Sequence, residues 1–74
     1  MLYEIKEVAA LSGATTKTLH YYHKINLLIP HYVNEYGYRF YSEENLLKLQ
    51  EILFYRKLDF SIKKYYKHIW KKVF

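Results

Sequence analysis

The stretch that decides the fold is ATTKTLHYYHKINLL, residues 14–28. At 3.6 residues per turn, Leu19 and Tyr22 fall on one side, toward a core. The opposite side carries basic and polar residues at the spacing i, i+3, i+4 and i+7: Lys17, His20, Tyr21 and Lys24. Such a stripe makes a poor core but suits phosphates and base edges. The stretch therefore predicts a helix that lies in the major groove of DNA.

A short amphipathic helix is expected before it, over residues 4–12. Gly13 follows, where a helix end favours the left-handed conformation. Thr15 stands where the second helix, residues 16–25, needs an N-cap. Two helices joined by a tight glycine-containing turn are typical of a helix-turn-helix. The apolar residues of the first helix have the required spacing: Ile5, Val8 and Ala9, with Leu11 beside them.

A β-hairpin is expected over residues 31–41, with a turn at residues 34–37. Gly37 supplies the positive φ that such turns need. Alternation puts Tyr38 and Phe40 on one face, and Arg39 and Tyr41 on the other. A lone hairpin is unstable, so one face must lean on the helices. The other face is then free to contact a ligand, as in a winged helix-turn-helix.

The segment between the second helix and the hairpin carries its own signals. Asn26 tolerates the left-handed conformation and is expected to end the second helix. Pro30 prevents that helix from resuming. We expect the three apolar residues between them to pack under the helix pair: Leu27, Leu28 and Ile29.

A third helix is expected from Ser42, its N-cap, to about Lys57. A fourth is expected to begin at Ser61. The chain is therefore predicted to be one mainly α domain, residues 1–74, with about four helices and a two-stranded wing. Residues 1–41 form the helix-turn-helix and wing, and residues 42–74 a helix pair. The third helix has a broad apolar stripe: Leu46, Leu49 and Leu53, widened by Leu47, Ile52 and Phe54.

The composition favours a polyanionic partner. The 74 residues carry a net charge of +5, which suits nucleic acid first and an anionic membrane surface second. Residues 63–72 hold five lysines and no acid. With no cysteine, disulfides, thiolate metal sites and cysteine nucleophiles are excluded.

Other functional classes find little support in the chain. The N-terminus lacks the apolar core of a secretory signal, and no apolar run could span a membrane, so we expect a cytoplasmic protein. His20 and His23 form H-x-x-H on a helix, but no acid or thiol completes a metal site. We find no catalytic constellation and no phosphate-cradling glycine loop. We expect neither an enzyme, nor a cofactor, nor a bound metal.

Five motifs occur in a characteristic order: YEIKEVA (3–9), TLHYY (18–22), LLIP (27–30), GYRFYS (37–42) and LQEIL (49–53). Together they resemble the DNA-binding domain of the MerR family of bacterial transcription regulators, over about residues 3–62. The resemblance implies a winged helix-turn-helix followed by a helix pair and a dimerisation helix. It also implies dimers that bend and untwist operator DNA between promoter elements, with RNA polymerase as a further partner.

The resemblance carries DNA contact onto the second helix, and backbone contact onto the wing. A Tyr22 ring packed inward with its hydroxyl at a phosphate would satisfy both this and the helical periodicity. The full set of candidate DNA-binding residues is Lys17, Thr18, His20, Tyr21, Tyr22, Lys24, Tyr38, Arg39 and Tyr41.

The chain departs from the family pattern at four positions. The family usually has arginine at His20, an acid at His23, and glycine at Asn26 and Asp59. A histidine at position 20 is shorter and mostly neutral at pH 7, which predicts a weaker grip on guanine or phosphate. The family's dimerisation helix would follow Phe74, so we expect an isolated or truncated domain of a longer regulator, or a small relative, with the homodimer left open.

Three alternatives remain open from the sequence. The chain could be an excisionase-like protein that bends DNA for a recombinase. It could instead be a basic module whose tail binds protein or an anionic membrane. On a smaller scale, Arg39 could pair with Glu35 or Glu43 rather than with a phosphate.

Overall fold

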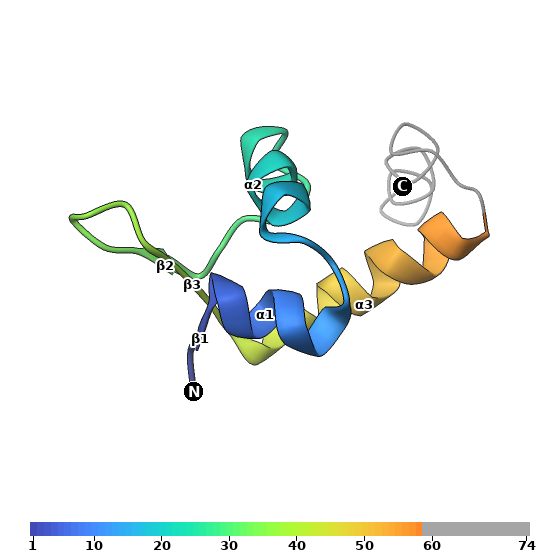
Figure 1. Ribbon diagram of the computed structural model, residues 1–74, viewed down its shortest axis with the longest axis horizontal. Coiled ribbons are helices and arrows are strands. Elements are labelled where there is room, and N and C mark those ends of the chain that lie inside the picture. Colours follow the sequence, from blue (N-terminus) through green and yellow to red (C-terminus); the bar gives the residue numbers. More distant parts are fainter. Residues whose placement is uncertain (59–74) are drawn as a thin grey trace, which may run out of the picture.

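The computed structural model describes residues 1–58, and the expected fourth helix lies outside the described residues. Three helices gather around one core while a small sheet projects from one end (Figure 1). The predicted class, mainly helical with a small antiparallel wing, is confirmed. The elements in order are β1 (Tyr3–Glu4), α1 (Ile5–Ser12), α2 (Thr16–Lys24), β2 (Tyr32–Val33), β3 (Arg39–Tyr41) and α3 (Glu43–Lys57).

The turn between α1 and α2 forms as the sequence predicts. Gly13 ends α1 with φ +80°, a conformation that costs glycine little because it has no Cβ. The Thr15 hydroxyl accepts a hydrogen bond from the backbone N–H of Thr18 at 3.0 Å and so caps α2. At the other end of α2, Asn26 takes the expected left-handed conformation, with φ +60°.

The sheet has three strands, in the order β1-β3-β2, where the sequence predicted two. Both pairings are antiparallel; Tyr3 lies opposite Tyr41, and Tyr32 lies opposite Phe40. The additional strand, β1, is only two residues long, too short for an alternation pattern to appear in the sequence. Its pairing attaches the wing to the start of α1.

The wing turn is held by Asn34 and Gly37. The Gly37 N–H donates to the Asn34 carbonyl at 3.0 Å, and the Asn34 N–H donates to the Tyr38 carbonyl at 3.0 Å. Asn34 Oδ1 accepts from the N–H groups of Tyr36 and Tyr38, at 3.0 and 2.9 Å. Gly37 has φ +84°, as expected, which matches a three-residue hairpin loop closed by a left-handed residue.

The core draws on all three helices, the loop after α2 and strand β3. Tyr41 is buried in it, so β3 contributes a large aromatic ring to the helical layer. None of the helices within residues 1–58 combines the length and apolar character needed to cross a bilayer. The fully buried side chains are Val8, Leu19, Tyr22, Leu27, Leu28, Tyr41, Leu49 and Ile52.

Four of the expected core residues are exposed instead. Leu11 and Phe54 border an open hollow between the α1–α2 turn and the last part of α3, which no other described element covers. Ile29 faces outward because Leu27 and Leu28 already fill the space beneath α2. Leu47 is exposed because α3 buries only the narrower stripe around Leu49 and Ile52.

Asn45, in the first turn of α3, connects that helix to the loop after α2. Its Oδ1 accepts from the N–H groups of Ser42 and His31, at 2.9 and 3.0 Å. Its Nδ2 donates to the carbonyl of Ile29 at 2.9 Å. The Ser42 hydroxyl in turn accepts from the Asn45 N–H, which confirms Ser42 as the N-cap.

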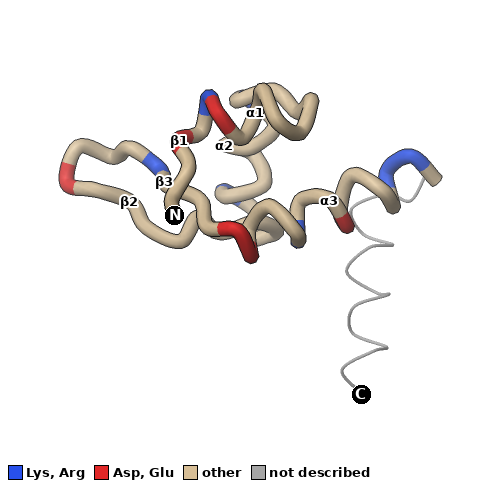
Figure 2. The backbone as a smooth tube through the Cα atoms, turned by 90° about the horizontal axis from the view of Figure 1, so that it is seen from below, with Lys and Arg blue, Asp and Glu red and all other residues tan. Residues whose placement is uncertain are grey.

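The charges on α3 follow its dipole. Glu43 and Glu44 occupy the first turn, and Arg56 and Lys57 the last (Figure 2). Acids near a helix N-terminus and bases near its C-terminus are both favourable. The acidic and basic residues therefore lie at opposite ends of α3.

Candidate nucleic-acid interface

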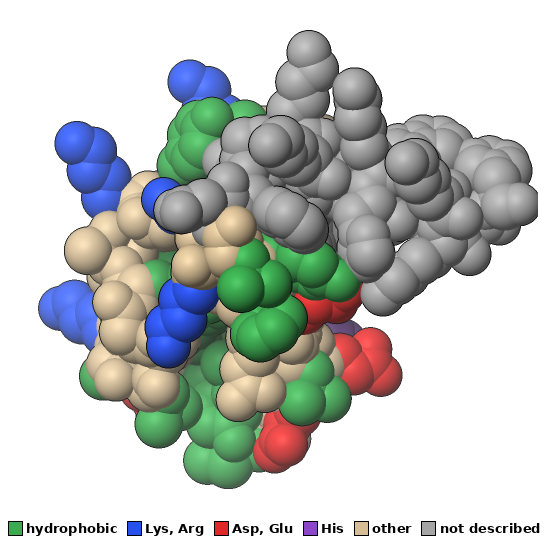
Figure 3. Space-filling model, turned by 90° about the vertical axis from the view of Figure 1, so that its right-hand side faces the viewer, with side chains coloured by type: hydrophobic (Ala, Val, Ile, Leu, Met, Phe, Trp, Pro, Cys, Tyr) green, Lys and Arg blue, Asp and Glu red, His purple; other side chains and the backbone are tan. Residues whose placement is uncertain are grey.

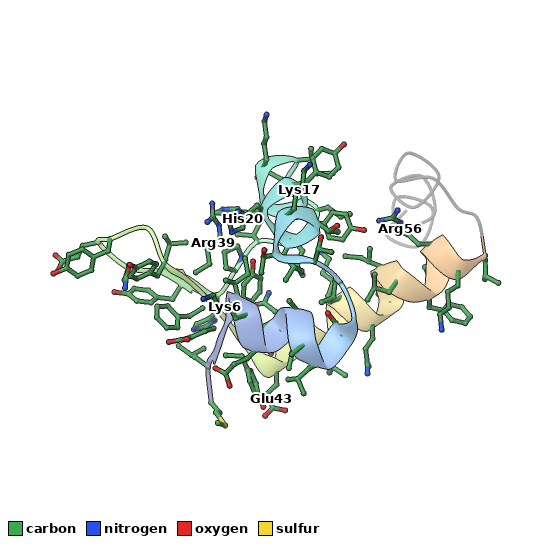
Figure 4. All side chains as sticks on the ribbon, in the orientation of Figure 1. Lys6, Lys17, His20, Arg39, Glu43 and Arg56 are labelled. Carbon is green, nitrogen blue, oxygen red and sulfur yellow. The ribbon has the colours of Figure 1, made fainter. Side chains whose placement is uncertain are left out.

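Helix α2 exposes the stripe that its sequence predicts. Leu19 and Tyr22 are buried beneath it, which fixes the rotation of the helix about its axis. Figure 4 shows His20 on the side of α2 that faces the wing and Arg39, and Lys17 at the start of the helix; both side chains are exposed. The four predicted residues of the stripe are all exposed, Tyr21 with 51% of its surface: Lys17, His20, Tyr21 and Lys24.

Arg39 connects the wing to this helix. Its Nε donates to Nδ1 of His23 at 2.9 Å, and the guanidinium lies in the gap between α2 and the wing (Figure 4). This bond replaces the ion pair with Glu35 or Glu43 that the sequence left open; Glu43 instead accepts from the Tyr3 hydroxyl at 3.3 Å. The exposed faces of α2 and the wing are thereby held in a fixed relation.

The environment of His23 favours the neutral imidazole. Partial burial lowers its pKa below the ordinary 6.5, and the nearby Arg39 and His20 side chains lower it further. Because Nδ1 accepts a hydrogen bond, the neutral ring carries its proton on Nε2. The same bond occupies one of the two histidines of the H-x-x-H pair.

For Tyr22, the structure confirms the buried ring but gives the hydroxyl a partner inside the protein. The ring is fully buried, as the helical periodicity predicts. The hydroxyl accepts a hydrogen bond from Nη1 of Arg56 on α3 at 2.6 Å, a contact inside the protein. The expected hydroxyl–phosphate contact would have to share the oxygen with Arg56.

The expectation for Tyr41 needs correction. Alternation along β3 placed it on the same face as Arg39, and the family resemblance implied a contact with the DNA backbone, but the structure buries it completely. The reason is tertiary: β1 pairs with β3 on one side, and α1 and α3 close over the end of the strand. Burial also raises the pKa of the Tyr41 hydroxyl. Tyr38, by contrast, is exposed, as predicted.

Thr18 lies at the edge of the α2 surface and is half-buried. Its N–H and its hydroxyl oxygen both bond to the Thr15 side chain, at 3.0 and 2.9 Å. These contacts stabilise the start of the helix, and they leave the Thr18 hydroxyl proton and one lone pair of its oxygen for a ligand.

Two basic residues near this surface were missed by sequence reasoning. Lys6, at the start of α1, borders a hollow together with Tyr38 and Arg39. Arg56 reaches Tyr22 across the other side of α2. In the sequence, Arg56 reads only as a favourable helix end, and nothing marks Lys6; the tertiary contacts supply the signal.

Acidic and basic side chains lie largely apart on one end of the molecule. Glu43 points away from the side that carries Lys17 (Figure 4). In the end-on view, Lys and Arg side chains project from the upper left, whereas most visible Asp and Glu atoms gather at the lower right (Figure 3). A cluster of positive side chains on one face favours the approach of a polyanion.

Comparison with known proteins adds to this geometry. Residues 3–68 match the family model described as MerR HTH family regulatory protein. The chain belongs to the MerR family. It is 44% identical over 62 residues to the HTH-type transcriptional activator mta of Bacillus subtilis, and 45% identical over 62 residues to the HTH-type transcriptional activator TipA of Streptomyces coelicolor. Each alignment covers 84% of this chain and 24% of the relative.

Solved MerR-family structures have the same fold. A MerR-family transcriptional regulator from Bacillus cereus superposes with a TM-score of 0.85 at 36% identity, covering 93% of this chain and 52% of that one. A cryo-EM structure of an EcmrR–DNA complex superposes with a TM-score of 0.79 at 44% identity, covering 82% of this chain and 23% of that one. This MerR-family chain thus spans about a quarter of the length of the curated relatives that it matches.

The lysine-rich stretch at residues 63–72 lies outside the described residues. The interaction-module alternative, which depends on that stretch, therefore stays a prediction. The excisionase-like alternative would use the same candidate surface, and the relatives named here are described as transcriptional activators.

Proposed function

We propose that this chain is the DNA-binding domain of a MerR-type transcription regulator, with α2 in the major groove and the wing on the phosphate backbone. The observation that carries the proposal is the bond from Arg39 to His23. It joins the wing to the exposed side of α2, so both can face a single duplex. A helix and a wing that pointed apart could not do so.

The residues would divide the work by their chemistry. Lys24, at the end of the helix, supplies a cation for a phosphate, whereas Lys17, His20 and Tyr21 are in reach of base edges. Arg39 and Tyr38 contact the backbone from the wing. Phosphate contacts set register, and contacts to bases supply sequence preference.

The proposal also names partners. The family resemblance implies operators between promoter elements, DNA that is bent and untwisted on binding, and RNA polymerase as the protein that uses the altered promoter. A homodimer is proposed on the same ground. The domain then acts in the cytoplasm, where bacterial DNA lies, and it performs no catalysis.

A salt titration tests the proposal. We would measure binding to a random-sequence duplex by fluorescence anisotropy at about 50 and 200 mM salt, because each neutralised phosphate releases counterions. Arg39→Ala should weaken binding to all sequences alike and reduce the salt slope by about one. Lys48→Ala, which removes an exposed lysine of α3 outside the proposed surface, is the charge-matched control.

A selection from randomised duplexes tests the division of labour. Lys17→Ala and Tyr21→Ala should change the preferred sequence, whereas Arg39→Ala should leave it intact and lower affinity. The proposal fails if the Lys17 and Arg39 variants, each shown to be folded by circular dichroism, bind duplex DNA as tightly as the native chain.

A further inference from the structure

We propose that His23 is the positioning residue for Arg39, and that protonation of His23 releases Arg39 and weakens DNA binding as the pH falls. This rests on the proposed DNA-binding function. It gives a role in binding to His23, a residue of α2 that does not belong to the exposed stripe.

The geometry gives His23 control over the guanidinium. The 2.9 Å bond uses Nε of Arg39, the nitrogen nearest the aliphatic stem, so it fixes the direction of the whole planar group. Among residues 1–58, Arg39 donates this hydrogen bond from Nε alone. Both of its Nη amines are therefore available for a phosphate. A guanidinium already oriented binds with less loss of side-chain entropy than a free one.

Protonation removes the basis of this bond. Taking up a proton from solvent turns Nδ1 from an acceptor into a donor. Two N–H groups and two positive charges would then face each other at hydrogen-bond distance, and the contact can no longer form. Arg39 must swing away, because the imidazole is held on a helix whose rotation is fixed by buried Leu19 and Tyr22.

The surrounding groups also oppose the proton. Arg39 reaches His23 from β3, and His20 reaches it from the preceding turn of α2; both lower its pKa, after burial. On the side of α1, Glu4 and Lys6 border the hollow that Arg39 lines. The neutral, accepting form of His23 is therefore the form present near neutral pH.

Two substitutions separate positioning from charge. His23→Asn keeps an oxygen acceptor near the place of Nδ1, has a similar helix propensity and does not titrate. His23→Leu removes the acceptor at every pH. His31→Asn, which removes an exposed histidine outside the proposed surface, is the matched control.

The experiment compares affinities for one random-sequence duplex at about pH 7.5 and at a lower pH at which NMR shows the His23 imidazole protonated, because its pKa lies below the ordinary 6.5. Relative to His23→Asn, the native chain should lose about three- to tenfold in affinity at the lower pH, the value of one typical hydrogen bond. His23→Leu should be weaker than both at pH 7.5. The ratio of native to His31→Asn affinity should not show this loss.

The opposite outcomes overturn the proposal. A native-to-His23→Asn ratio that rises at low pH would mean that imidazolium simply adds a phosphate contact. A flat ratio would mean that His23 does not control Arg39. In the free protein, NMR should show Arg39 ¹⁵Nε titrating together with His23; lack of this coupling also overturns the proposal. Coupling without any affinity loss in Arg39→Ala would instead mark failure of the DNA-binding function.

Discussion

Arg56 of α3 donates from Nη1 to the hydroxyl of Tyr22 on α2, with 2.6 Å between the two atoms. The Tyr22 ring is fully buried, whereas Arg56 is exposed. The bond therefore connects the basic end of α3 to the buried side of α2. It adds a contact between two elements that otherwise meet mainly through apolar side chains.

A double-mutant cycle measures this contact. Tyr22→Phe and Arg56→Gln should each lower the free energy of unfolding by about 1 kcal/mol, because each leaves the same single hydrogen bond unmade. The double variant should be little worse than either single one, which urea denaturation followed by circular dichroism can show. Lys57→Gln, at the neighbouring position, is the control. Strictly additive losses would mean that the two groups do not interact.

Removing the buried Tyr41 hydroxyl should change the free energy of unfolding in the opposite direction. Among residues 1–58, no group is found within hydrogen-bond distance of it, so it is buried at a cost. Tyr41→Phe should raise the free energy of unfolding by about 1 kcal/mol and leave DNA affinity unchanged. Tyr22→Phe serves as the matched comparison, because it removes a hydroxyl that does have a partner. Weakened DNA binding by Tyr41→Phe would return Tyr41 to the interface.

Replacing Asn45 should cause a larger loss of stability. Asn45→Ala removes two side-chain hydrogen bonds that attach α3 to the loop after α2 and the capping-box bond from the Ser42 N–H, and should lower the free energy of unfolding by about 2 kcal/mol. Gln50→Ala, at an exposed position of the same helix, should change it by less than about 0.5 kcal/mol. Thermal or urea unfolding distinguishes the two; equal effects would show that Asn45 acts only through helix propensity.

The lowered pKa of His23 predicts a pH dependence of stability. In the interval between its folded pKa and the ordinary 6.5, the unfolded chain binds more protons than the folded one. Stability therefore rises with pH across that interval, and His23 adds no slope above it. The urea midpoint should rise more steeply between about pH 5 and 7 for the native chain than for His23→Asn. Parallel curves would contradict the shift.

Local signals were sufficient for most of the helical fold. Gly13 and Thr15 fix the helix-turn-helix junction because a left-handed end and an N-cap depend on the residues themselves. Strand β1 escaped prediction because two residues carry no period, and its partner lies far along the chain. The burial of Tyr41 also escaped prediction, because its face of β3 is covered by elements that lie far away in the sequence.

The sequence by itself determined the two helices of the junction, the exposed stripe on α2, the wing turn and the start of α3, since these depend on helical period, caps and turn residues close together in the chain. Only the tertiary structure decided that Arg39 meets His23, that Arg56 meets Tyr22 and that Tyr41 is buried. These contacts join residues 16 and 34 positions apart or depend on several elements closing over one strand. No local pattern records such encounters, because they arise only when the helices and the sheet pack together.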